Sequence, residues 1–114
     1  MYPILISAHF TKQLKDYLKK YRHLQKDLVK ALENPESQNP IHLGKNVYKF
    51  RLKCRDIQRG KSKSFRVIFL IREESRLIIP LAIYFKGDKE DVSDLELNVH
   101  LASTILELQN LKIG

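Results

Sequence analysis

The stretch from residue 45 to residue 72 constrains this chain more than any other part of it. It holds ten Lys and Arg residues and one acid, Asp56, so it carries a net charge of +9 in a chain whose net charge is +8. Burying unpaired cations is prohibitively costly, so these side chains have to face water or a polyanion. The fold must therefore present one strongly cationic surface, to which these residues contribute: Lys45, Lys49, Arg51, Lys53, Arg55, Arg59, Lys61, Lys63, Arg66 and Arg72.

Apolar and cationic side chains alternate at the start of this stretch. The apolar set is Tyr48, Phe50, Leu52 and Cys54, and the cationic set is Lys49, Arg51, Lys53 and Arg55. A period of two residues is typical of a half-buried β-strand. We therefore predict a strand over residues 48–55 that turns one face to a core and carries four cations on the other.

A second strand is predicted over residues 65–71, after a polar loop at 56–64. It is apolar except at Arg66, and a lone Arg inside an apolar strand needs a reason. If the two strands pair as a hairpin, Arg66 joins the cationic face of the first. A solvated basic strand is the simpler interpretation, but the concentration of charge on one face favours a site for a polyanion.

The rest of the chain completes the expected fold. Residues 2–7 form a short apolar run, typical of a first strand, and apolar residues at helical spacing then predict two helices that end before Pro35. Residues 34–44 are expected to form a loop. A strand follows at 77–85, with a bulge or one-sided pairing at Pro80 because proline donates no ladder hydrogen bond.

The last helix is expected to begin at Ser93, where Ser93 and Glu96 match a capping box. One apolar stripe along it is expected to face the core, formed by Leu95, Val99, Ala102 and Leu106 and widened by Leu101, Ile105 and Leu108. The element order is then β-α-α-β-β-β-α. This order predicts a single α+β domain, residues 1–114, in which a small, twisted, mainly antiparallel sheet packs on a helical hairpin.

Composition excludes several classes of protein. The single cysteine, Cys54, allows no internal disulfide, which favours the reducing cytoplasm, and its place on the apolar side of a strand favours a core role. A signal peptide and an apolar run of transmembrane length are both missing from the sequence, so we expect no membrane association. The pI near 9.7 fits a nucleic-acid partner.

The sequence offers little to a metal ion or cofactor, and we expect none. The four histidines are far apart in the chain and lack ligand spacing. Gly60-Lys61-Ser62 resembles the end of a phosphate-binding P-loop, but that motif needs a glycine where Arg55 stands. The acids Asp88, Glu90 and Asp91 are interpreted as a solvated loop, with a cation site or a catalytic base as the alternative.

Taken together, the motifs resemble the RelE/ParE superfamily of bacterial toxins, and most closely its HigB-like, RelE-type branch. The similarity runs from about Ile4 to Leu106 and includes the order of the elements. The segments that carry it are Tyr48-Lys49-Phe50-Arg51-Leu52, Arg59-Gly60-Lys61-Ser62, Phe65-Arg66-Val67-Ile68-Phe69 and the run from Tyr84 to Asp91 followed by Ser93.

This resemblance implies a toxin of a type II toxin–antitoxin system that cleaves messenger RNA in the ribosomal A site and so inhibits translation. The implied chemistry needs no metal or cofactor: the ribose 2′-OH attacks the adjacent phosphate, and cations stabilise the charge that develops. The implied partners are the ribosome with its mRNA and rRNA, and a cognate antitoxin with a helix-turn-helix DNA-binding domain.

The resemblance also implies roles for individual residues. Arg66 would hold the scissile phosphate, and Lys49 and Arg51 would hold phosphate or move a proton. Lys89 would contact the leaving group or phosphate, and Tyr84 or Phe85 would stack on a base. The implied contacts to ribosomal RNA are Lys53, Arg55, Arg59, Lys61, Lys63 and Lys86.

Two other functions stay open on the sequence. Residues 106–114 contain neither Tyr nor His, although well-known members of the superfamily use such a residue at their C-terminal end. A ParE-like inhibitor of DNA gyrase that cuts nothing is therefore the first alternative. An inactive relative that only binds RNA or its antitoxin is the second.

Overall fold

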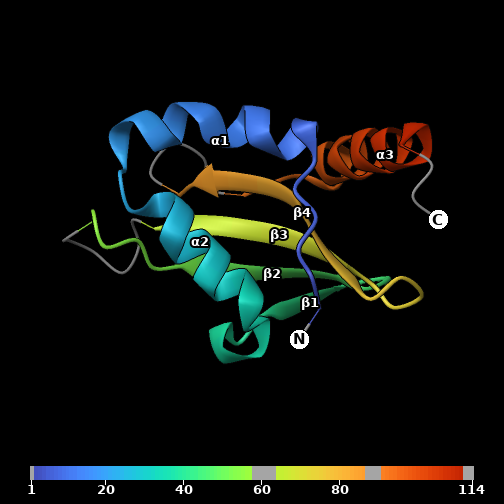
Figure 1. Cartoon of the computed structure of the whole chain (residues 1–114), viewed down its shortest axis with the longest axis horizontal. Helices are drawn as coiled ribbons and strands as arrows, with labels where there is room; N and C mark the ends of the chain where they lie inside the picture. The colour runs from blue at the N-terminus through green and yellow to red at the C-terminus, as the bar shows by residue number, and fades with distance from the viewer. Residues whose placement is uncertain (1, 58–63, 87–90, 112–114) are drawn as a thin grey trace.

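In its described residues the chain folds into three α-helices and one four-stranded antiparallel sheet with strand order β1-β2-β3-β4 (Figure 1). The computed structural model describes residues 2–57, 64–86 and 91–111. The predicted α+β class is confirmed. The elements are α1 (Ala8–Lys20), α2 (Leu24–Glu33), the 3₁₀ helix η1 (Pro35–Gln38), β1 (Ile41–Gly44), β2 (Val47–Leu52), β3 (Phe65–Arg72), β4 (Leu77–Phe85) and α3 (Asp94–Asn110).

Helices α1 and α2 cover one face of the sheet. Figure 1 shows α1 running along β4, while α2 crosses obliquely in front of β3 and β2. Ser7 caps α1, since its Oγ accepts a hydrogen bond from the amide of Phe10 at 3.0 Å. Alternate residues of the strands pack under these helices, so Phe50, Phe65 and Val67 are buried on this face.

The other face of the sheet is covered only in part, by the beginning of α3. Val47, Ile68 and Ala82 are buried there against Leu97 and Leu101 of that helix. The remaining positions of this face belong to the cations of β2 and β3. The sheet therefore has one face packed under α1 and α2 and one face that is half core and half polar site.

The predicted first strand does not form over residues 2–7. Its only pairing is a parallel bridge of Ile4 with Ile78, made by Leu5 N to Ile78 O and Ile78 N to Pro3 O, both at 2.9 Å. Proline has no amide to extend this ladder, and α1 is capped at Ser7, which leaves no room for more pairs. The segment ties the N-terminus to β4 rather than adding a full strand.

The predicted loop at 34–44 contains η1 and β1, which the sequence interpretation missed. β1 has exposed side chains, with Ile41 61% exposed, so it lacks the burial pattern of a half-buried strand. Lys45 and Asn46 join β1 to β2 with φ values of 49° and 66°. Two residues at positive φ are typical of a type I′ hairpin turn, and Asn46 was the available signal for it.

The register of β3 against β4 shifts beside Pro80, as the sequence predicted. Pro80 lies opposite Phe69, whereas the neighbouring pair joins Ile68 to Ala82, so Leu81 is the additional residue of the bulge. At this irregularity the ladder does not need the hydrogen bond that proline, which has no N–H, is unable to donate. The pairing is regular again from Ala82 to Phe85, which places Tyr84 directly opposite Arg66.

Helix α3 begins where the sequence predicted, but a different face of it packs against the rest of the protein. The capping box is present, with Glu96 N donating to Ser93 Oγ at 3.1 Å and Ser93 N to Glu96 Oε1 at 3.3 Å. The centre of the expected stripe is wrong, because Leu95, Val99 and Leu106 are 74%, 56% and 59% exposed. Leu101 and Leu108, which were expected to widen the stripe, do face the core. Apolar residues occupy several faces of this helix, so spacing alone could not select the one that docks, which carries Leu97, Leu101, Thr104 and Leu108.

Contacts with α1 decide how α3 is oriented. The carboxylate of Glu107 accepts hydrogen bonds from the amides of Ala8 and His9, at 2.6 and 3.1 Å. His9 Nε2 and His100 Nδ1 lie 2.8 Å apart. These polar contacts join α3 to the N-terminal end of α1. Within the described part of the chain, no helix has both the length and the apolar character needed to cross a bilayer.

Candidate anion-binding site

Three polar side chains form a row across the open face of the sheet. Arg51 of β2 lies directly opposite Arg66 of β3, which lies directly opposite Tyr84 of β4. Cross-strand partners share one face with their Cβ atoms about 4.5–5.5 Å apart. Lys49 points to the same face two residues before Arg51. The structure thus brings together four of the five predicted catalytic residues.

Arg66 lies at the centre of this row and is only 8% exposed. Its Nη1 donates a hydrogen bond to Ser64 Oγ. Burial and the neighbouring Arg51 cation lower the pKa of Arg66. Arginine nevertheless stays charged in proteins, so two like charges are held side by side on adjacent strands. Such an arrangement favours a bound anion.

Asp91 supplies a negative charge to the site. Its Oδ1 accepts hydrogen bonds from the Tyr84 hydroxyl at 3.0 Å, from Lys49 Nζ at 3.3 Å and from the Val92 amide at 2.8 Å. The Val92 amide above all, with Tyr84 and Lys49, holds the pKa of Asp91 below its usual value. Asp91 lies in a loop with its side chain 64% exposed, as the sequence interpretation expected, but its carboxylate also takes part in the site. Its place just before the α3 capping box was the available signal.

Tyr84 is a neutral hydrogen-bond donor in this site. Burial, followed by the hydrogen bond to Asp91, raises the pKa of Tyr84 well above its ordinary value of 10.0. The phenol therefore keeps its proton at neutral pH and does not act there as a base. Its hydroxyl can donate to a carboxylate or to a phosphate oxygen.

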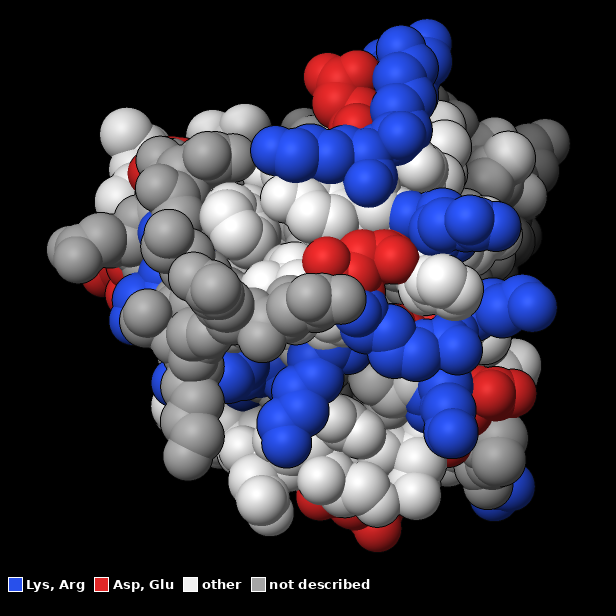
Figure 2. Space-filling view, turned by 90° about the vertical axis from the view of Figure 1, so that its left-hand side faces the viewer, with Lys and Arg blue, Asp and Glu red and all other residues white. Residues whose placement is uncertain are grey.

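The other predicted contact residues are spread around one end of the molecule. Lys53 is exposed just past the end of β2, and Lys86 follows β4, where its amide donates to Ser64 O at 3.0 Å. Lys89 and three predicted RNA contacts, Arg59, Lys61 and Lys63, lie outside the described residues. Figure 2 looks at this end of the molecule and shows many more Lys and Arg side chains than Asp and Glu.

The predicted strand does not continue to Arg55. β2 ends at Leu52, and a turn follows in which Ile57 N donates to Cys54 O at 3.0 Å. Arg55 turns toward α2, where its amide and its Nε contact the carboxylate of Asp27 at 2.9 and 3.0 Å. The predicted row of four cations is therefore wrong beyond Arg51. The ion pair with Asp27 is the physical reason.

A second polar cluster follows the end of β2. The carboxylate of Asp56 accepts from the amide of His23 at 2.7 Å and lies 2.8 Å from His23 Nδ1. Cys54 Sγ contacts the same carboxylate at 3.6 Å. Cys54 is buried, and burial raises the pKa of its thiol, so Cys54 belongs to the core as the sequence predicted.

Replacing Asp56 with asparagine is expected to flatten the acid side of the stability profile. His23 lowers the pKa of Asp56 below the ordinary 3.8, through its side chain first and its amide second. The stabilisation is therefore complete above the unfolded-state pKa and is lost as the pH falls through the folded-state value. Urea unfolding at pH 7 should show D56N as less stable than wild type, and the difference should shrink toward pH 2. Asp16→Asn, on an exposed carboxylate, is the control and should leave the profile unchanged.

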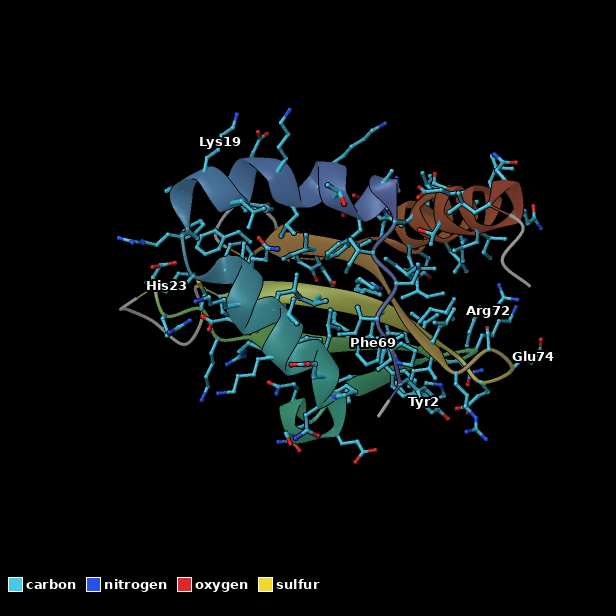
Figure 3. The ribbon with its side chains drawn as sticks, in the orientation of Figure 1. Tyr2, Lys19, His23, Phe69, Arg72 and Glu74 are labelled. Carbon is cyan, nitrogen blue, oxygen red and sulfur yellow. The ribbon has the colours of Figure 1, made fainter. Side chains whose placement is uncertain are left out.

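A groove lies on the other face of the sheet. It has a volume of about 840 Å³ and runs between α2, η1 and the N-terminal segment, over a floor that includes Tyr48 and Phe69. Figure 3 shows Phe69 and Tyr2 on this side. Three acids line the groove, Glu33, Glu36 and Glu73, against one cation, Lys30. Such a lining repels phosphate, so charge places an anion on the open face instead.

The described residues contain no group of three or more His, Cys, Asp or Glu side chains that could hold a metal ion. The site supplies five polar groups of its own. Those groups are two guanidinium groups, an ammonium, a phenol and a carboxylate, arranged around one open face. They can bind an anion and stabilise negative charge.

Comparison with known proteins identifies relatives of this chain. A family model described as the RelE toxin of the RelE/RelB toxin–antitoxin system matches residues 7–113. The isolated E. coli RelE toxin superposes with a TM-score of 0.52 at 17% identity, covering 92% of this chain and 99% of that one. The likeness at this identity concerns the fold.

Two further solved structures are similar at lower scores. One is a free E. coli RelE mutant with two arginines replaced, with a TM-score of 0.48, 21% identity, and coverage of 78% of this chain and 87% of that chain. The other is the intact E. coli RelBE toxin–antitoxin complex, with a TM-score of 0.48, 17% identity, and coverage of 73% and 94%. The search of curated proteins gave no match.

Proposed function

Because this chain belongs to the RelE toxin family, we propose that it is a ribosome-dependent endonuclease of messenger RNA that acts from a single domain in the cytoplasm. Family membership makes it a toxin of a type II toxin–antitoxin system. The nuclease activity rests on one observation, which is the row of Arg51, Arg66 and Tyr84 beside Lys49. Assignment to the HigB-like branch stays a prediction from the sequence.

This row suits cleavage of RNA without a metal ion. In that reaction the 2′-OH gives up its proton and its oxygen attacks the adjacent phosphate. A cyclic phosphate forms, and the bond from phosphorus to the 5′-oxygen breaks as that oxygen takes up a proton. The phosphorane that develops carries additional negative charge, which preorganised cations stabilise most where water is partly excluded. Arg66 meets this requirement, because it is largely buried yet shares its face with Arg51.

We assign roles within this proposal from the geometry. Arg66 contacts the scissile phosphate, and Lys49 and Arg51 hold its other oxygens. Tyr84, neutral at pH 7, donates a hydrogen bond rather than accepting a proton. Lys89 stays a prediction for the leaving-group contact.

Contacts to ribosomal RNA are proposed for the cations around the end of the sheet. Lys53 and Lys86 border the row, and Arg59, Lys61 and Lys63 stay predictions from the sequence. Arg55 is the weakest candidate, because it is already paired with Asp27, although 59% of its side chain is exposed. Each such contact adds affinity through counterion release rather than base recognition.

We also propose how an antitoxin partner binds. A helix-turn-helix antitoxin with an acidic segment would cover the cationic row or displace α3. The apolar residues that α3 exposes, Leu95, Val99 and Leu106, support a contact at this helix. The acidic segment would be complementary to the charge of the row.

A cell-free translation system tests the nuclease. We expect new mRNA 5′ ends within translated message when the protein and ribosomes are both present, and intact message when ribosomes are omitted. The distribution of ends over codons would also give the sequence preference. Cleavage of free message at the same rate would contradict ribosome dependence.

The same experiment separates the alternatives. Halted translation on intact message would indicate an inactive relative that blocks the ribosome by binding. Unaffected translation would favour the ParE-like alternative, which the lack of Tyr and His in residues 106–114 keeps open. A supercoiling assay with purified gyrase would then be decisive.

A further inference from the structure

The carboxylate of Asp91 binds two of the donors that this site offers to an anion. Its Oδ1 contacts Lys49 on β2 and Tyr84 on β4, and β3 runs between these two strands. Adjacent strands lie about 4.8 Å apart, and Lys49 and Tyr84 reach the same oxygen from the two strands that flank β3. Arg66 is the residue of β3 that lies opposite Tyr84. The carboxylate therefore lies where an anion bound by this row would lie.

The electrostatics agree with this position. The pKa of Arg66 is lowered by burial and by Arg51, and the negative charge of Asp91 acts against that lowering. Asp91 thus neutralises part of the repulsion between the cations of the row. A bound phosphate would do the same with the same donors, because carboxylate and phosphate oxygens both accept charge-assisted hydrogen bonds.

The contact is also one that can open. The side chain of Asp91 is 64% exposed, whereas that of Lys49 is 21% exposed, so the carboxylate covers its partners from the solvent side. Exposed ion pairs are weak. The capping box of Ser93 and Glu96 anchors the backbone next to Asp91. A rotation of the Asp91 side chain alone would then uncover Lys49 and the Tyr84 hydroxyl.

We propose that Asp91 is a built-in anion that holds the phosphate position of this site, so that an RNA phosphodiester binds by displacing the Asp91 carboxylate from Lys49 and Tyr84. The choice of RNA as ligand rests on the proposed function. The displacement itself rests on the contacts of Asp91. Because the ligand has to displace the Asp91 carboxylate, Asp91 weakens binding of the ligand in the wild-type protein.

Removing the charge of Asp91 changes the affinity for the ligand in opposite directions under this proposal and under a purely structural role. If Asp91 only positions Lys49 and Tyr84 for the ligand, removing its charge loosens both donors and weakens binding. If Asp91 competes with phosphate, removing its charge strengthens binding. Asp91→Asn separates the two, because asparagine keeps the shape and can still accept hydrogen bonds from Val92 and Tyr84.

The experiment measures binding of a fluorescent 2′-O-methyl RNA oligonucleotide by anisotropy. This probe has no free 2′-OH, so it cannot be cleaved, and the result does not depend on nuclease activity. We expect D91N to bind about twofold to fivefold more tightly than wild type, the factor that an exposed ion pair is worth. The dependence of log K on log salt should steepen by about 0.7, because one more cation is free to neutralise a phosphate.

Glu74→Gln is the matched control, since it makes the same change in net charge. Glu74 is exposed in the turn between β3 and β4, and Figure 3 shows it far along the molecule from His23, which lies near the other end of the sheet. It should change affinity by less than the D91N variant and leave the salt slope unaltered. Tighter binding by E74Q of the same size would overturn the proposal, because net charge alone would then explain D91N.

Asp91→Ala is a second variant that removes the same charge, so the test does not depend on D91N alone. Thermal unfolding of each protein verifies that it is folded. Both Asp91 variants should bind more tightly than wild type. Equal or weaker binding by a folded D91N would overturn the proposal and support the positioning role. Failure of wild type and D91N alike to bind the RNA would overturn phosphate as the ligand. Tighter binding by D91N without any cleavage of natural mRNA would keep this inference and reject the nuclease.

Discussion

Replacing Arg66 with alanine is expected to abolish growth arrest and to reduce ribosome-dependent cleavage of mRNA by about 10²–10³-fold, the usual loss when one preorganised donor to a developing charge is removed. Arg66 is 8% exposed and lies between Arg51 and Tyr84 in the row, so no flexible surface cation can replace it. The measurement is the rate at which new 5′ ends appear in the cell-free system.

The fold should survive this substitution. The cation of Arg66 is held partly out of water beside Arg51, and both features lower its pKa, so its removal relieves an unfavourable arrangement. We expect the free energy of unfolding to change by no more than about 1–2 kcal/mol, the usual range for single substitutions. Urea unfolding of purified R66A checks this point.

Two variants serve as controls for R66A. Arg66→Lys keeps the charge but loses the planar fork that binds two phosphate oxygens, so it should retain part of the activity. Lys53→Ala removes an exposed cation just beyond β2 and should weaken ribosome binding only modestly. Growth arrest by a folded R66A at the wild-type level would remove Arg66 from the mechanism.

The part of this site that the sequence predicted depends on local rules. Alternation with period two placed Lys49 and Arg51 on one face, with Phe50 and Leu52 on the other, and the strand confirms it. The hairpin then placed Arg66 opposite Arg51, as expected. Both results follow from pleat geometry, which needs only neighbouring residues.

The features that the sequence did not predict depend on contacts between distant segments. Asp91 joins the site through Lys49, 42 residues earlier in the chain. Arg55 leaves the cationic face because Asp27 of α2 is within reach. Neither partner can be read from spacing, since every acid of the chain is an equal candidate until the fold is known.

The packing of α3 also depends on contacts that the local sequence does not predict. Its residues satisfy helical spacing on more than one face, and the sequence interpretation chose the face with Leu95 and Val99. The docked face was decided by Glu107 and His9 at α1 and by Leu97 against the sheet. Amphipathic spacing predicts a helix reliably but selects its buried face only when polar residues fill the opposite one.

Replacing Phe65 with alanine is expected to lower the free energy of unfolding by about 3–5 kcal/mol, the usual cost of truncating a buried phenylalanine. Phe65 is fully buried. Its ring centroid lies 5.0, 5.2 and 5.3 Å from those of Tyr17, Tyr21 and Phe85, with edge contacts to all three. Since small domains are stable by only about 5–15 kcal/mol, this loss is a large fraction of the total.

Urea unfolding measures the effect of Phe65→Ala, with Leu95→Ala as the matched exposed control. Leu95 is 74% exposed on α3, so truncating it should change stability by less than about 0.5 kcal/mol. Phe65→Leu fills most of the cavity and should fall between the two. A loss below about 1 kcal/mol for F65A would contradict the packing of this aromatic cluster.

The substitutions at Phe65 and Arg66 test the two opposite faces of the sheet at the start of β3. Phe65 and Arg66 are consecutive residues of β3, so the first points to the covered core and the second to the open row. F65A should lose stability and, where it remains folded at low temperature, keep cleaving message, since every cation of the row is present. R66A should show the reverse. If F65A lost cleavage while still folded, the aromatic cluster would have to be holding Arg66 in its working position.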